Sequence, residues 1–138
     1  MRLAFACALM LLASACGGDG VLLDTGTGIP EGPTLTSIQA SIFTPRCALG
    51  GCHAGPEPQQ GMDLSAGKSY AHIVRVPSTE LPAFQRVAPK VSADSYIIMK
   101  LSGDPRISGE RMPFGGPYLT LAEIDSIRQW IDAGAPND

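Results

Sequence analysis

Apolar residues recur with the period of an α-helix in three segments of this chain. In the first segment, Leu35, Ile38 and Ile42 fall on one helical face. This spacing predicts a helix over 35–43, which Pro45 would end because proline cannot continue a helix.

The second segment predicts a buried helix over 93–101, since apolar residues dominate the run from Ala93 to Leu101. Ser92 is the expected N-cap and Gly103 the expected terminator. Within this helix we expect Met99 to fill the core rather than to bind a ligand.

The third segment predicts the C-terminal helix. Thr120 and Glu123 have the spacing of a capping box, and Gly134 is placed to end the helix. Its apolar stripe consists of Leu121, Ile124, Ile127 and Ile131. We expect Trp130 in the same helix to serve packing.

The composition points to short helices joined by long ordered loops. The chain of 138 residues contains 12 prolines and 16 glycines and only 6% aromatic residues, which does not suit a sandwich or a barrel. We found no internal repeat, and the length fits one domain with a targeting sequence. The expected fold class is therefore mainly α, in a small domain of the kind that often needs a cofactor to complete its core.

The charge pattern excludes nucleic acid as a partner. The formal net charge is −3, and no cluster of Lys and Arg is present. A nucleic-acid-binding protein would carry a basic patch.

The N-terminus has the pattern of a secretory signal peptide over residues 1–15. One positive charge precedes a short apolar run, which is below the roughly 20 residues of a stable membrane span. The sequence Ala13-Ser14-Ala15-Cys16 resembles a bacterial lipobox, in which Cys16 would be lipidated and begin the mature protein. The alternative is ordinary cleavage after Ala15.

Residues 16–35 are rich in glycine and lack periodicity, which predicts a flexible tether between the lipid anchor and a domain over 36–138. The expected location is outside the cytoplasm. A lipid on Cys16 would anchor the protein to a membrane, with the domain facing the periplasm or the cell surface.

Two of the remaining cysteines form the motif Cys47-Ala48-Leu49-Gly50-Gly51-Cys52-His53. Two thiols followed at once by a histidine in an exported protein resemble a c-type haem attachment site. The spacer holds four residues rather than the usual two, and the glycines in it can fold the longer loop back.

Two other interpretations of this motif remain open. A disulfide between Cys47 and Cys52 is natural in an oxidising compartment, although it leaves His53 without a role. A zinc site that adds His72 is a more distant alternative, and we expect His72 to be partly buried and hydrogen-bonded instead.

A haem iron bound by histidine on one side often takes a methionine sulfur on the other. Met112 is the preferred candidate, because it lies 59 residues after His53 in a loop that Pro113 and nearby glycines shape. Met62 is only nine residues from His53, which disfavours a path to the opposite face of the ring, whereas Met99 is expected to lie in the core.

Several ordered blocks of the sequence give the chain a family resemblance from about Thr36 to Asp138. They are Ile42-Phe43, Cys52-His53, Gly61-Met62-Asp63-Leu64-Ser65, Ser95-Tyr96, Lys100-Leu101, Arg111-Met112-Pro113 and Trp130-Ile131-Asp132-Ala133-Gly134-Ala135. The chain resembles class I c-type cytochromes, and more narrowly it is similar to the planctomycete-type cytochrome c domains of exported bacterial lipoproteins.

This resemblance implies a cytochrome c-like domain whose loops wrap one haem c. It implies covalent attachment through Cys47 and Cys52, with His53 as the proximal and Met112 as the distal iron ligand. The expected function is electron transfer with redox protein partners, rather than catalysis. A haem-free binding or scaffolding module is the alternative, and an enzyme or gas sensor with an open iron site is a further one.

Overall fold

The computed structural model describes residues 32–138. Within this range the chain forms a small, mainly α domain of four α-helices joined by loops, and it contains isolated β-bridges but no β-sheet. The predicted fold class is confirmed at this level. None of the helices in this range has the length and apolar character needed to cross a bilayer. The signal peptide, Cys16 and most of the tether lie outside the described residues.

The first helical segment starts at α1 (Leu35–Ile38), where Thr34 and Ser37 form a capping box. It continues without a break as a π-helix (Gln39–Cys47), so the prediction that Pro45 ends the helix is wrong. A proline ring clashes with the carbonyl four residues earlier in an α-helix, and the wider π-helical turn accommodates it. Thr34 and Leu35 therefore belong to the folded domain, and the helix ends at Cys47.

Helix α4 (Leu121–Asp132) has the predicted N-terminus, with the reciprocal Thr120 and Glu123 capping box. Gly134 follows the helix with φ +111°, as expected of a terminator. The predicted stripe is buried except at Leu121, which is 77% exposed because the first turn extends beyond the core. Trp130 is fully buried, and its Nε1 donates to the Pro136 carbonyl.

Helix α3 (Tyr96–Ser102) begins three residues later than predicted, after a 3₁₀ turn (Ser92–Asp94). Ser92 is not its N-cap, because the Ser92 hydroxyl and N–H both donate to the Asp132 carboxylate at 2.9 Å. Gly103 terminates the helix with φ +74°, as predicted. Met99 is 1% exposed, so its assignment to the core is confirmed.

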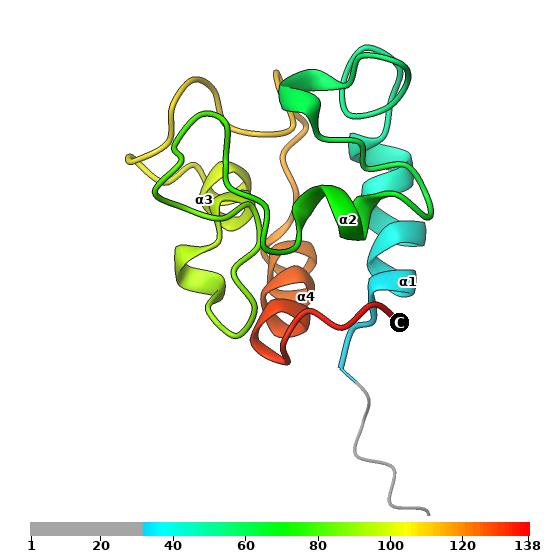
Figure 1. Cartoon of the computed structure of the whole chain (residues 1–138), viewed down its shortest axis with the longest axis vertical. Coiled ribbons are helices and arrows are strands. Elements are labelled where there is room, and N and C mark those ends of the chain that lie inside the picture. Colours follow the sequence, from blue (N-terminus) through cyan, green and yellow to red (C-terminus); the bar gives the residue numbers. More distant parts are fainter. Residues whose placement is uncertain (1–31) are drawn as a thin grey trace, which may run out of the picture.

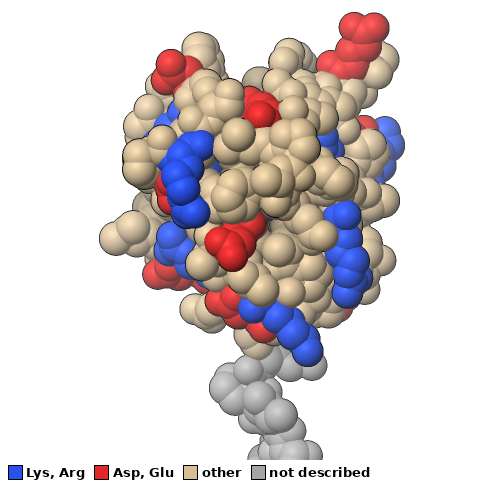
Figure 2. All heavy atoms as spheres, turned by 60° about the vertical axis from the view of Figure 1, so that its left-hand side comes forward, with Lys and Arg blue, Asp and Glu red and all other residues tan. Residues whose placement is uncertain are grey.

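The helices surround one hydrophobic core. Helix α4 contacts both α1 and α3. The short helix α2 (Ser69–Ile73) lies in front of them in Figure 1. Along the chain, a 3₁₀ turn (Gln59–Gly61) precedes α2. The largest fully buried side chains are those of Trp130, Phe43, Ile38, Leu64, Ile73, Met99, Ile124, Ile127 and Ile131. On the face seen in Figure 2, acidic and basic side chains are interspersed, and neither sign forms an extended patch.

The C-terminal residue is bound to the start of α1. The Asp138 side chain accepts from the Leu35 N–H at 2.7 Å, and its carbonyl accepts from the Thr36 N–H at 3.1 Å. From there the helical segment that begins with α1 runs along the molecule to the Cys47 loop at the opposite end (Figure 1).

Candidate functional site

The Cys47–Cys52 motif forms a compact loop directly after the π-helix. The Cys52 N–H donates to the Leu49 carbonyl at 2.9 Å, and the His53 N–H donates to the Cys47 carbonyl at 3.2 Å. Gly51 has φ +80°, a left-handed conformation that glycine adopts without strain. These bonds fold the four-residue spacer back on itself, so that His53 follows close to Cys47.

The two thiols of this loop differ in environment. Both are free, so the alternative disulfide is not formed in this structure. Cys47 is partly buried and packs against the core, whereas Cys52 is exposed. Burial raises the pKa of the Cys47 thiol to about 11, although the neighbouring Arg46 cation acts in the opposite direction. Cys47 is therefore protonated at neutral pH.

His53 carries an unpartnered polar atom. Its Nδ1 is buried and has no hydrogen-bond partner. Among residues 32–138, no other buried side-chain nitrogen or oxygen lacks a partner. Burial lowers the pKa of His53, and the carbonyls of Met62 and Gln59 oppose this effect by favouring the protonated ring. The lowered pKa keeps the ring mostly neutral near pH 7, which is the form that binds metals.

Met112 is held by the end of α3. Its N–H donates to the Lys100 carbonyl at 2.9 Å, and the preceding Arg111 donates through Nε to the Leu101 carbonyl at 2.8 Å. The Met112 side chain is half-buried and packs against the core. The Met112 backbone N–H and the preceding Arg111 side chain are thus both bonded to the C-terminal part of α3.

Arg46 joins the cysteine loop to the chain segment that follows Met112. It donates through Nη2 to the Pro117 carbonyl at 2.7 Å and pairs with Glu123 at 3.2 Å. The fold therefore brings the cysteine loop next to Pro117, which lies five residues after Met112. Cys47 and Met112 also contact the same core cluster. Sequence analysis did not single out Arg46, although its position next to Cys47 was visible.

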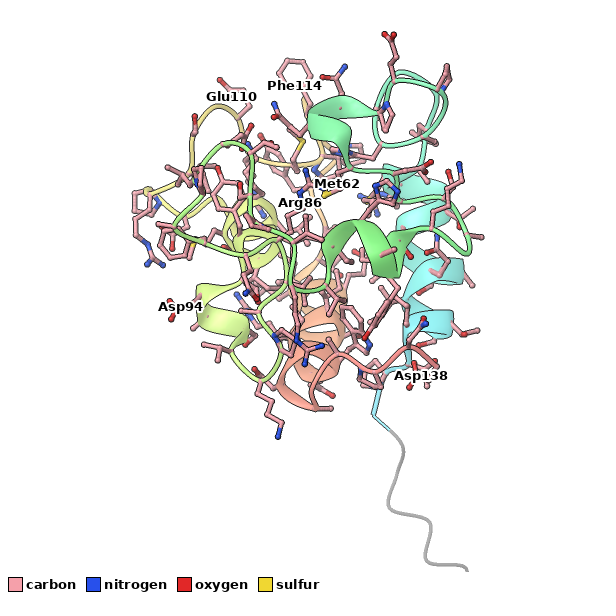
Figure 3. The ribbon with its side chains drawn as sticks, viewed as in Figure 1. Met62, Arg86, Asp94, Glu110, Phe114 and Asp138 are labelled. Carbon is pink, nitrogen blue, oxygen red and sulfur yellow. The ribbon has the colours of Figure 1, made fainter. Side chains whose placement is uncertain are left out.

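Met62 lies close to the same region. It is half-buried and packs against the core cluster, as Met112 does. In Figure 3 it lies toward the same end of the molecule as Phe114, which is two residues after Met112. Two thioethers, those of Met62 and Met112, therefore lie at the edge of the core, whereas Met99 is buried within it.

No group of three or more His, Cys, Asp or Glu side chains suited to a metal ion is found among residues 32–138. The alternative zinc site at the two cysteines, His53 and His72 is thus not assembled. His72 is half-buried instead, and its Nδ1 lies 3.3 Å from the Asp63 N–H and 3.2 Å from the Gly61 carbonyl.

Arg86 is a buried cation near this site that sequence analysis missed. It lies below Met62 in Figure 3, and its positive charge contributes to the lowered pKa of His53. Its guanidinium donates to three carbonyls, those of Gln60, Gly61 and His72. Arg86 forms no salt bridge with a carboxylate of residues 32–138. Burial lowers the pKa of its guanidinium. The sequence around it gave no periodic signal.

Comparison of the chain with protein-family models, with curated proteins and with solved structures gave no match. The chemistry of the site residues is therefore the basis for assigning a function.

Proposed function

We propose that this protein is a monohaem c-type cytochrome that carries electrons outside the cytoplasm. The observation that supports it best is a buried Nδ1 atom without a hydrogen-bond partner on His53, the residue that directly follows two free thiols in the sequence. A buried polar atom without a partner costs about 1 to 3 kcal/mol, so such an atom indicates an unfilled role. Binding to haem iron would engage the imidazole.

The donor set fits haem c. Cys47 and Cys52 would hold the porphyrin by adding each S–H across one vinyl C=C bond, with sulfur joining one carbon and hydrogen the other. This addition consumes no oxidant, whereas a disulfide between the same thiols needs one. When bound, the haem supplies the one-electron change between ferrous and ferric iron.

His53 would be the proximal ligand and Met112 the distal one. Met112 is favoured over Met62 because hydrogen bonds to α3 fix its backbone, and because Arg46 ties its segment to the cysteine loop. With both axial positions filled, the iron would exchange electrons without binding a substrate, which makes the protein a carrier for redox protein partners rather than an enzyme. The lipid anchor at Cys16 belongs to the same proposal.

The decisive experiment is expression with cytochrome c maturation machinery, followed by boiling in detergent and reductant. Thioether bonds survive reduction, so haem should stay on the chain in a stained gel, and the intact mass should include one haem. Cys52→Ala should weaken or abolish this attachment, and His72→Ala should leave it unchanged. An intact mass that shows only a Cys47–Cys52 disulfide would refute the proposal in favour of a haem-free binding module.

The distal ligand is tested separately. Met112→Ala should abolish the sulfur-to-iron charge-transfer band of the ferric protein and open the ferrous iron to carbon monoxide, with the haem still covalently bound. Met62→Ala is the matched control, since Met62 is also a half-buried thioether at the core. If Met62→Ala removes the band and Met112→Ala does not, Met62 is the ligand.

A further inference from the structure

A buried polar cluster contacts the loop that carries Met112. We define it as the Lys100 cluster, which consists of Glu80, Tyr96, Lys100 and Ser108. Tyr96 and Lys100 are 5% and 8% exposed, although both carry polar groups. Buried polar groups are retained only where they are paired, so their partners show what the cluster does.

Lys100 contacts both ends of the loop from Ser108 to Met112. Its ammonium donates to the Ser108 carbonyl at 2.8 Å, and its backbone carbonyl accepts from the Met112 N–H at 2.9 Å. A single helical residue therefore holds the start and the end of this loop. Gly109 permits the arrangement, because its φ of +67° is a left-handed conformation that glycine adopts without strain.

Tyr96 reinforces the same end of the loop. Its hydroxyl accepts from the Ser108 N–H at 3.0 Å and donates to Glu80 at 2.8 Å. Glu80 in turn pairs with the Lys100 ammonium at 3.0 Å, which neutralises the buried charge. Apart from the Tyr96–Glu80 hydrogen bond, each of these contacts involves Ser108 or Lys100, the residue that holds Met112.

We infer that Lys100 and Tyr96 are positioning residues that set how firmly Met112 occupies the distal position of the haem iron. This inference rests on the proposed function. A thioether is a weak iron ligand that competes with small ligands such as imidazole. Its occupancy depends on how far the loop restricts the sulfur to one place, since a fixed geometry lowers the entropic cost of ligation.

The test compares Tyr96→Phe with Tyr70→Phe in the ferric holoprotein. Tyr96→Phe removes the hydroxyl that holds Ser108, whereas Tyr70 packs against the core and its hydroxyl makes no hydrogen bond among residues 32–138. Imidazole is titrated while the sulfur-to-iron charge-transfer band is followed. Tyr96→Phe should raise the apparent affinity for imidazole about tenfold, because it removes the buried hydrogen bond that holds the Ser108 N–H. Tyr70→Phe should change it less than about twofold.

Lys100→Met provides a second variant that keeps the length of the side chain and removes both ammonium contacts. It should shift the imidazole affinity in the same direction, and hydrogen exchange at the amides of Ser108 and Met112 should accelerate in both cluster variants but not in Tyr70→Phe. Equal imidazole affinities and exchange rates in Tyr96→Phe and Tyr70→Phe would overturn the inference and leave the proposed function intact. A wild-type chain that carries no covalent haem would overturn both.

Discussion

Replacing Gly103 by alanine is predicted to destabilise the protein by disturbing the residue next to Met112. Gly103 ends α3 with φ +74°, a conformation that alanine adopts only at a cost. A Cβ at this position would also lie 2.9 Å from Cδ of Arg111, which is closer than carbon atoms approach without displacement. Arg111 must therefore move when residue 103 gains a side chain.

The expected cost has two parts. The left-handed conformation costs alanine about 1 to 2 kcal/mol, from which the lower entropy of the unfolded chain returns about 0.4 to 1 kcal/mol. Movement of Arg111 weakens its hydrogen bond to the Leu101 carbonyl, at about 0.5 to 1.5 kcal/mol. It also disturbs the guanidinium over the Tyr118 ring, 4.1 Å from the centroid, at about 0.5 to 1 kcal/mol. The sum is about 2.5 kcal/mol.

Gly67→Ala provides a matched control, because Gly67 has φ +79° but no atom within 4 Å of the added Cβ. Urea denaturation of the haem-free protein should show that Gly67→Ala costs about 1 kcal/mol and Gly103→Ala about 1.5 kcal/mol more. In an Arg111→Ala background the extra cost should disappear, as a double-mutant cycle would record. Equal costs for the two glycine substitutions in the wild-type background would refute this account of Arg111.

Three further predictions concern individual side chains. Iodoacetamide should modify Cys52 of the haem-free protein before Cys47, because a pKa of about 11 leaves roughly one Cys47 thiol in 10,000 ionised at pH 7; equal rates by peptide mass spectrometry would contradict this. Hydrogen bonds from Lys68 and Ser65 hold the pKa of Asp63 well below 3.8, so the ionised Asp63 carboxylate should stabilise the fold above pH 3.8 and lose this effect as the pH falls further. In acid titrations the difference in stability between wild type and Asp63→Asn should therefore shrink as the pH falls. A difference that stays constant with pH would contradict this prediction. Arg86→Met removes the donor to three carbonyls and should lower the free energy of unfolding, measured in urea, by about 3 kcal/mol. The same change at the exposed Arg75 should lower it by less than about 0.5 kcal/mol. Similar losses in the two variants would contradict the stabilising role of the Arg86 hydrogen bonds.

Helix boundaries were predictable where the signal is local. The ends of α4 follow from Thr120, Glu123 and Gly134, because a capping box and a terminal glycine determine the helix boundary within a few residues of their own positions. The start of α3 was not predictable, because Ser92 binds Asp132, which is 40 residues away in the sequence. The continuation through Pro45 depends on a π-helical register that hydrophobic spacing does not reveal.

The candidate site shows the same division. The cysteine motif and Met112 stand out in the sequence because their residue types are chemically distinctive. The contacts that position them join distant segments, such as Arg46 with Pro117 and Tyr96 with Glu80, so periodicity could not indicate them. A lysine within the apolar run that forms α3 was the one available signal, since a buried charge requires a partner.

The hydrogen bonds between Asp138 and the start of α1 place both ends of the described chain at one pole of the domain, away from the cysteine loop (Figure 1). Immobilisation on an electrode through either end would consequently present the same orientation, with the Cys47–Cys52 loop pointing away from the support. With the proposed haem bound, voltammetry of protein grafted through its N-terminal and its C-terminal side should therefore give matching interfacial electron-transfer rates when the linkers are of equal length.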